Sequence, residues 1–189
     1  MVICGSTSVS VDRVTDRVDP TVDPFATPPE AKTPLRRFRG RLATGVTIWT
    51  SGHADSRAGL TVSSVIVGDG EPPVIGGLVG DLTSLWDALT ATGRFVVHVL
   101  DGSQSVLADV FAGLRPSPGG VFAGLEVEDS AYGPVLPFLG TRVRCRLLET
   151  RSAGYQPLVL GAVEAVEVGD LDTPLIHFRG RYRRLDQRG

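Results

Sequence analysis

The pattern of apolar and polar residues along this chain predicts a domain built mainly from short strands. Seven runs rich in apolar and β-branched residues predict strands, at 46–50, 61–67, 74–79, 94–100, 141–150, 157–168 and 174–185. These strands are grouped rather than alternating with long helices, which favours an antiparallel sheet over a doubly wound parallel one. We therefore expect a mainly β fold, a closed or partly closed antiparallel barrel with helices at its rim.

Helical periodicity is confined to three short segments, at 35–42, 84–92 and 103–113. In the first segment, apolar residues recur at spacings of three and four, and Gly45 is expected to end the helix. The second is expected to begin at an N-cap of Thr83 or Ser84 and to end at Gly93. Thr83 and Ser84 therefore lie where a strand gives way to the start of a helix.

Residues 1–34 differ in composition from the rest of the chain. They alternate Val with Ser, Thr and Asp, and then carry prolines at 20, 24, 28, 29 and 34. Prolines at this density exclude a regular helix or a central strand, so we expect an extended or disordered tail over 1–34. The remaining residues, 35–189, are expected to form one domain. A chain of this size buries roughly 70% of its unfolded surface and needs no disulfide or metal to hold a core.

Composition limits the compartment and the partners of the protein. Hydrophobic residues make up 42% of the chain and charged residues 21%, with a formal net charge of −2, which argues against a general nucleic-acid binder. Cys4 and Cys145 show no paired spacing, which favours a reduced compartment. No stretch approaches the roughly 18 apolar residues of a membrane span, and the N-terminus lacks a signal-peptide pattern. We expect a cytoplasmic protein without a membrane partner.

Two arginine groups echo each other, RRFRGR at 36–41 and RGRYRR at 179–184. Nucleic-acid binding is one interpretation of such groups. The single lysine and the negative net charge favour solvated arginines or arginines at a dimer contact instead. The three histidines, His53, His98 and His177, match no metal-ligand spacing, so no metal site is expected.

Hydroxyl side chains gather at two places in the predicted barrel. Thr61, Val62, Ser63 and Ser64 follow one another in a strand, and Thr83 and Ser84 stand at the start of a helix. An exposed edge strand would explain the first group alone. A helix N-terminus, however, offers free N–H groups and a partial positive charge that favour phosphate. Both groups together suggest a phosphorylated ligand whose large flat or apolar portion supplies part of the affinity.

In order along the chain, several segments resemble the flavin reductase-like family, and they cover about residues 36–185. They are FRGRLATGVTIWT, AGLTVSS, PPVIGGLV, LTSLWDAL, GRFVVHVL, LADVFAG and PLIHFRGRYRRL. The resemblance implies an antiparallel, Greek-key-like split barrel that binds FMN, or alternatively FAD, and acts as a homodimer. It also implies NADH or NADPH as the co-substrate.

The resemblance assigns the hydroxyls to the flavin. By it, Thr61, Val62, Ser63 and Ser64 line the flavin ring and ribityl chain, while Thr83 and Ser84 hold the phosphate. Where many members of the family carry Gly-Asp-His beside the nicotinamide, this chain has Gly154-Tyr155-Gln156. Where many carry Ser-Ser-Thr before the helix tryptophan, it has Thr83-Ser84-Leu85. No catalytic residue is assigned.

The family resemblance implies NAD(P)H-dependent reduction of FMN and delivery of reduced flavin to a partner monooxygenase. Two alternatives on the same scaffold stay open. One is a divergent enzyme that acts on another small molecule, which the altered 154–156 segment favours. The other is a flavin-binding protein without catalytic activity. For Tyr155 itself, the sequence allows two placements, over the flavin in the nicotinamide space or out in solvent.

Overall fold

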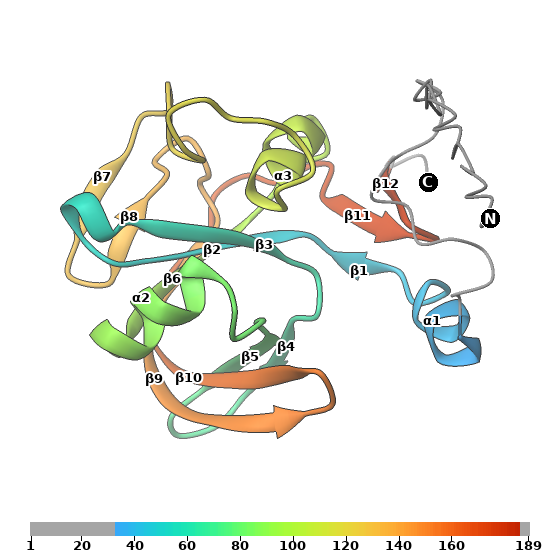
Figure 1. Cartoon of the computed structure of the whole chain (residues 1–189), viewed down its shortest axis with the longest axis horizontal. Coiled ribbons are helices and arrows are strands. Elements are labelled where there is room, and N and C mark those ends of the chain that lie inside the picture. Colours follow the sequence, from blue (N-terminus) through green and yellow to red (C-terminus); the bar gives the residue numbers. More distant parts are fainter. Residues whose placement is uncertain (1–32, 186–189) are drawn as a thin grey trace, which may run out of the picture. The chain divides into compact units, whose positions relative to one another are not determined.

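The computed structural model describes residues 33–185, which form three antiparallel sheets and a few short helices (Figure 1). The helices are α1 (Pro34–Arg39), the 3₁₀ helix η2 (Ala54–Ser56), α2 (Ser84–Thr92) and α3 (Ser105–Phe111). The strands are β1 (Thr44–Gly45), β2 (Thr47–Ser51), β3 (Ala58–Val62), β4 (Ile66–Gly68), β5 (Val74–Leu78), β6 (Arg94–Val99), β7 (Glu128–Ser130), β8 (Gly133–Val135), β9 (Arg142–Ala153), β10 (Gln156–Glu167), β11 (Leu175–Phe178) and β12 (Arg181–Arg184).

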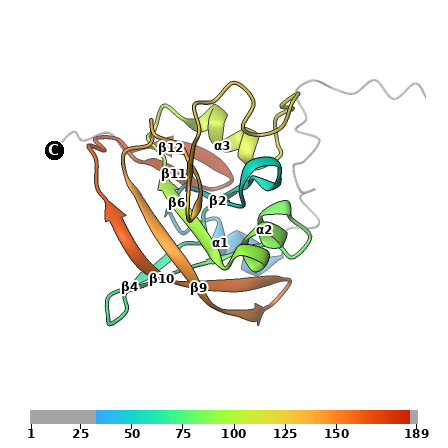
Figure 2. The same ribbon diagram turned by 90° about the vertical axis from the view of Figure 1, so that its left-hand side faces the viewer.

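The largest sheet is antiparallel and has the strand order β3-β2-β6-β9-β10-β5-β4. Its two edge strands, β3 and β4, follow each other directly in the chain and are joined by residues 63–65 alone. The sheet must therefore curl until its two edges lie close enough for this short connection. Figure 2 shows β9 and β10 bending across the middle of this curl. The α2 helix packs on β2, β3 and β6, and α3 on β2 and β3. The predicted mainly β split barrel with short rim helices is therefore confirmed.

The strand predicted at 61–67 is two strands, and this part of the prediction is wrong. The chain leaves β3 after Val62 and resumes as β4 at Ile66. The two strands pair with different neighbours, β3 with β2 and β4 with β5, at opposite edges of the sheet. A continuous strand cannot serve both edges, so residues 63–65 turn between them. Local sequence pattern gave no sign of this break.

Two hairpins and the end of the first helix also differ from the predictions. The segment 174–185 is a hairpin, β11–β12, whose turn residues Arg179 and Gly180 have φ of 53° and 74°, the left-handed values of a tight hairpin turn. The β7–β8 hairpin was not predicted. The first helix ends at Gly40 rather than at Gly45, because β1 pairs with β11 instead of continuing the helix.

The tail predicted over 1–34 lies outside the described residues, apart from its last two positions. Thr33 caps α1, with its Oγ1 accepting a hydrogen bond from the Arg36 N–H (3.3 Å), and Pro34 begins the helix. Within 33–185, none of the helices has the length and apolar character needed to cross a membrane.

Trp49 organises the core inside the curled sheet. Its ring stacks on Phe95 with the ring centroids 4.9 Å apart. Glycines on the facing strands let the backbone approach these rings. A Cβ on Gly77 of β5 would lie 2.8 Å from the Trp49 ring, and a Cβ on Gly161 of β10 would lie 2.5 Å from the Phe95 ring. The close contact of β5 and β10 with the two rings therefore requires glycine.

His98, a residue of β6, is buried between β2 and the loop after β8. Its Nδ1 lies 3.2 Å from the Ile48 carbonyl oxygen, and its Nε2 accepts the Leu136 N–H at 3.1 Å, which assigns the proton of a neutral ring to Nδ1. Burial lowers the pKa of His98 to about 4, and the nearby Arg142 and Arg144 act in the same direction. His98 therefore links three parts of the core only in its neutral form.

This burial predicts a loss of stability in mild acid. Above the ordinary histidine pKa of 6.5, His98 is neutral in both the folded and the unfolded protein. Between pH 6.5 and pH 4 it binds a proton in the unfolded chain and stays neutral in the folded protein. The free energy of unfolding should therefore fall by about 3 kcal/mol between pH 6.5 and pH 4 from this group alone. Urea unfolding at several pH values measures it. His98→Gln should flatten the dependence and the exposed-site control His53→Gln should not; equal slopes in all three proteins would contradict the assignment.

Candidate functional site

The end of β5 brings together the three segments that the sequence selected. The Leu78 N–H donates to Ser64 Oγ (2.8 Å), and the Val79 N–H donates to the carbonyl oxygen of Pro157, next to Gln156 (3.0 Å). The Gly80 carbonyl oxygen accepts from Thr83 Oγ1 (2.7 Å). Ser64, Thr83 and Pro157 are thus held around three consecutive backbone positions. We refer to residues 78–80 with these three segments as the β5 site.

The hydroxyls of Thr61, Ser63 and Ser64 differ in which hydrogen-bond donors and acceptors remain free for a ligand. Thr61 Oγ1 donates its proton to the Ala108 carbonyl oxygen (2.7 Å) and retains acceptor capacity. Ser64 Oγ accepts from Leu78 and retains its proton. The half-buried Ser63 hydroxyl has no hydrogen bond with any described residue. Val62 is buried in the core around Trp49, so its side chain holds the segment in place.

A chain of hydrogen bonds fixes where this segment leaves the sheet. The Trp49 indole N–H donates to Thr47 Oγ1 (3.0 Å), which in turn donates to the Val62 carbonyl oxygen (2.6 Å). All three residues are buried. Because the chain turns directly after Val62, the core determines the position of Ser63 and Ser64.

The structure separates the roles of Thr83 and Ser84. Thr83 is the N-cap of α2, and its hydroxyl both donates to Gly80 and accepts the Trp86 N–H (3.2 Å), so it is committed to the helix. Ser84 is exposed, and its hydroxyl has no hydrogen-bond partner among the described residues. The first N–H groups of α2, at Ser84 and Leu85, have no acceptor within the helix. These amides and the Ser84 hydroxyl are therefore the hydrogen-bond donors that remain free at this end of α2.

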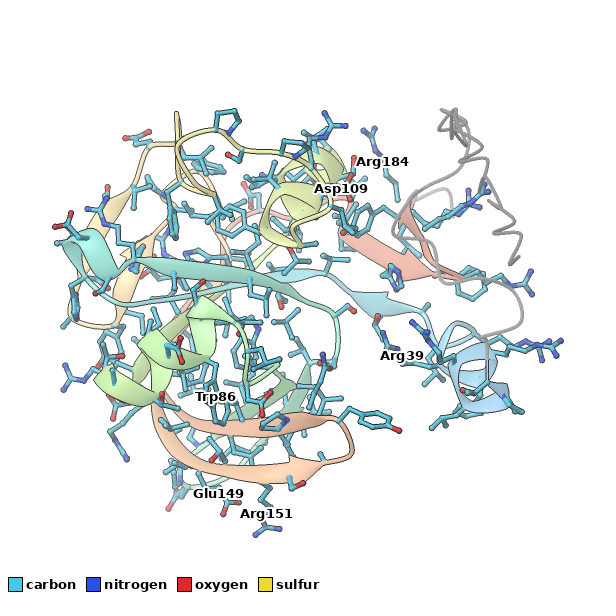
Figure 3. All side chains as sticks on the ribbon, in the orientation of Figure 1. Arg39, Trp86, Asp109, Glu149, Arg151 and Arg184 are labelled. Carbon is cyan, nitrogen blue, oxygen red and sulfur yellow. The ribbon has the colours of Figure 1, made fainter. Side chains whose placement is uncertain are left out.

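Ser84 lines a hollow of about 350 Å³ between η2 and α2, to which the 61–64 segment does not contribute. The charged residues around this hollow include Asp55 and Asp87, while Arg57 pairs with Asp129 through Nη2–Oδ2 at 2.7 Å. Carboxylates disfavour a neighbouring phosphate because like charges repel. Trp86, labelled in Figure 3, lies on the same helix near the sheet.

The 154–156 segment forms the tip of the β9–β10 hairpin. Gly154 has φ of 75°, as expected for the residue that makes this bend. Tyr155 is fully exposed, which corresponds to the solvent placement of the two that the sequence allowed. Gln156 turns the other way, since a Cβ built on Gly80 would lie 3.8 Å from Gln156 Nε2 and 3.6 Å from the Thr83 methyl carbon. Gln156 is therefore the member of the segment that belongs to the β5 site.

The remaining reactive side chains of residues 33–185 lie outside the β5 site. Groups of three or more His, Cys, Asp or Glu suited to a metal ion are absent from this part of the chain. Cys145 is buried, and burial raises the pKa of its thiol to about 12, so it is not a thiolate nucleophile at neutral pH. His177 pairs with Thr44 across β1 and β11, and burial, followed by the charge of Arg39, lowers its pKa.

The sequence did not reveal a larger hollow of about 460 Å³ beside α3. It has mainly apolar walls without charged residues, formed by Ser103, Gln104, Val106, Leu107, Val110, Ser117, Val121, Ala123, Leu125 and Phe138. The amphipathic pattern of 103–113 indicated an inward face, but it could not show that the loop at 117–125 leaves space above it. The hydrogen bond from Thr61 to Ala108 joins α3 to the strand that leads into the β5 site.

Comparison with known proteins gives this arrangement a family. Residues 39–186 match the family model described as "Flavin reductase like domain". The chain belongs to this family. The match covers all the elements around the β5 site, and it makes the protein an oxidoreductase of the flavin reductase type.

Three proteins illustrate the relationship. The reductase component of 4-hydroxyphenylacetate 3-monooxygenase from Thermus thermophilus is 30% identical over 154 residues, 82% of this chain and 97% of that protein. The FMN reductase (NADH) RutF of Variovorax paradoxus is 30% identical over 165 residues, 87% of this chain and 92% of that one. A solved structure of the Streptomyces globisporus NADH:FAD oxidoreductase SgcE6, in complex with NAD and FAD fragments, has a TM-score of 0.74 at 25% identity, covering 86% and 98% of the two chains.

The groups around the β5 site fit the polar parts of a flavin nucleotide. A flavin ring edge and ribityl chain present both donors and acceptors, and the 61–64 segment offers a free hydroxyl at Ser63, a proton at Ser64 and an acceptor at Thr61. The exposed start of α2 offers N–H groups to a phosphate. Leu85, in place of the threonine common in the family, is completely buried, so it adds core packing and no hydroxyl to this end of α2.

Ser63 and Ser84 can be tested separately by comparing FMN with riboflavin, which lacks the phosphate. Ser84→Ala should weaken FMN by about 1–3 kcal/mol, and riboflavin by much less, if the hydroxyl bonds the phosphate. Ser63→Ala should weaken both ligands equally, because ring and ribityl groups are common to both. Titration of flavin fluorescence measures all four affinities.

Thr90→Ala is the matched control, since Thr90 is a hydroxyl residue of the same helix that bonds only its own helix, at the Trp86 and Asp87 carbonyls. Equal losses for both ligands in Ser84→Ala would show an effect through folding. An unchanged FMN affinity in Ser84→Ala would show that the hydroxyl does not bind the phosphate and that only the backbone amides of α2 could do so.

Proposed function

We propose that this protein is an NAD(P)H-dependent flavin reductase that uses FMN and supplies reduced flavin to a partner monooxygenase. The observation that carries this function is the convergence of the 61–64, 80–84 and 154–156 segments at the end of β5, in a chain of the flavin reductase family. FAD, which has the same ring, is the alternative cofactor. Two relatives support both halves of the proposal, since one is an FMN reductase and the other is the reductase component of a monooxygenase.

In this proposal the chain positions its ligands and contributes no proton-transfer couple of its own. FMN, when bound, supplies the chemistry of hydride acceptance. Thr61, Ser63 and Ser64 hold the polar edge and ribityl chain. Thr83 caps α2, and the free N–H groups at the start of this helix receive the phosphate together with the Ser84 hydroxyl. Val62 anchors the segment in the core. Gln156, beside Gly80, faces the nicotinamide side with an amide that donates and accepts hydrogen bonds but does not titrate.

We further propose a homodimer in the cytoplasm. The family resemblance implies the dimer, and the two unpaired cysteines of the sequence favour a reduced compartment. Light scattering at micromolar concentration should therefore give twice the chain's mass of 20.0 kDa. A monomer at that concentration would contradict the homodimer, and the β5 site would then consist of residues from one chain only.

The reductase proposal predicts NADH oxidation that depends on added flavin and is limited by the 154–156 segment. Because Gln156 replaces an imidazole beside Gly80, turnover with FMN should be below the enzyme median of about 10 s⁻¹. Gln156→His should raise kcat/KM for NADH, and the double variant Tyr155→Asp, Gln156→His should add little to it because Tyr155 is in solvent. Loss of NADH absorbance with FMN, FAD and no flavin measures these rates.

Tyr155→Asp alone is the matched control and should leave the rate unchanged. Absence of flavin-dependent oxidation with both NADH and NADPH would overturn the reductase proposal. Flavin binding without oxidation would favour a non-catalytic flavin-binding protein. A rate near the median that Gln156→His does not alter would place the nicotinamide away from this segment and leave the reductase proposal standing.

A further inference from the structure

A buried hydroxyl lies beside the core around Trp49, close to the β5 site but outside it. It belongs to Thr47, a residue of β2 that is only 6% exposed and lies on the same face of the strand as Trp49. Burying a hydroxyl costs free energy unless the group forms hydrogen bonds. The partners of the Thr47 hydroxyl therefore show what this side chain does.

Chemistry fixes the direction of the hydrogen bonds at Thr47. An indole N–H can only donate, so Thr47 Oγ1 accepts from Trp49 Nε1 (3.0 Å), and its single proton goes to the Val62 carbonyl oxygen (2.6 Å). Thr47 is also the residue opposite Val62 in the register of β2 and β3, at the end of that pairing. The hydroxyl therefore holds the last residue of β3, directly before the chain turns away.

The segment after Val62 is held a second time two residues later. Ser64 Oγ accepts a backbone N–H of β5 at 2.8 Å. β5 itself is packed against the first point of attachment, since a Cβ on Gly77 would lie 2.8 Å from the Trp49 ring and 3.2 Å from the Val62 side chain. Hydrogen bonds on both sides therefore set the position of Ser63, the one residue between Val62 and Ser64.

We propose that Thr47 is a positioning residue of the flavin site, whose hydroxyl orients the Ser63 hydroxyl toward the flavin without touching the ligand. This inference rests on the proposed function, which supplies the ligand of Ser63. The Ser63 hydroxyl is half-buried and bonds no described residue, so its direction follows from the backbone on either side. A hydrogen bond weakens steeply when its length or angle is wrong, and the hydrogen bond from Thr47 to Val62 limits both.

The same strand carries a second buried hydroxyl that serves another part of the fold. Thr50 is completely buried, and its Oγ1 donates to the carbonyl oxygen of Pro134 on β8 (2.5 Å). Thr47 and Thr50 each donate one proton to one backbone carbonyl, and both are buried within a single chain. Only Thr47 bonds the strand that leads into the β5 site. Thr50 is therefore a matched control for the loss of a buried hydroxyl.

A double-mutant cycle with riboflavin, measured by titration of flavin fluorescence, tests the coupling between Thr47 and Ser63. Ser63→Ala should weaken riboflavin about fivefold in the wild-type protein, the effect of one neutral hydrogen bond. Thr47→Val keeps the shape of the side chain, removes the hydroxyl, and should weaken riboflavin by at least as much. In the Thr47→Val background, Ser63→Ala should change the affinity less than about twofold, because a misplaced hydroxyl has no hydrogen bond to lose.

Three further variants separate positioning from a general loss of stability. Thr47→Ser keeps the hydroxyl and should restore both the wild-type affinity and its dependence on Ser63. Thr50→Val should change riboflavin affinity less than about twofold, although urea unfolding should show a loss of stability comparable with that of Thr47→Val. Thr47→Cys, whose thiol donates only weakly, takes the place of Thr47→Val in the cycle if the valine variant does not fold.

Additive effects of Thr47→Val and Ser63→Ala, an equal loss of affinity in Thr50→Val, or no effect of Ser63→Ala in the wild-type protein would overturn the positioning role. Each of these results leaves the reductase proposal standing. Coupled effects in a protein that oxidises neither NADH nor NADPH would uphold the positioning role while the reductase proposal fails. A wild-type protein that binds neither riboflavin nor FMN would overturn both.

Discussion

Trp49 is the residue on which the curled sheet and the β5 site both depend. Its ring stacks on Phe95 and meets the backbone of β5 at Gly77, so the ring determines how closely β5 can approach the centre of the sheet. Its indole N–H begins the hydrogen-bond chain through Thr47 to the Val62 carbonyl oxygen. One buried side chain therefore positions the end of β3 and the whole of β5. The candidate flavin-binding groups lie directly after these two strands.

The hydroxyls that distinguish the sequence have unequal roles once their hydrogen bonds are counted. Thr83 stabilises the start of α2 and Ser64 holds the end of β5, so both hydroxyls form hydrogen bonds within the fold. The hydroxyls of Ser63 and Ser84 form none with the described residues. Polar side chains in this part of the molecule thus serve either the architecture or the ligand.

The arginines of two regions of the molecule differ in whether they form ion pairs. Around β9 and β10, arginines are paired, with Arg142 and Arg144 both contacting Glu167 and Arg146 bonding Glu164 at 2.8 Å. On α1 and the β11–β12 hairpin they are unpaired among the described residues. The ion pairs of the first region join β9 to β10, the two strands of the long hairpin that carries Gln156 at its tip.

The sequence by itself determined the elements that depend on neighbouring residues. The cap and end of α2 at Thr83 and Gly93 follow from local hydrogen bonding and a left-handed glycine, and the strand runs follow from apolar and β-branched composition. Ordered motifs of the family also indicated the split barrel. Only the tertiary structure decided that 61–67 breaks at Ser63, that Tyr155 faces solvent while Gln156 lies beside Gly80, and that two distant arginine groups meet. These outcomes depend on which strands pair and how the sheet curls, and such long-range contacts leave no periodic signal in the residues themselves.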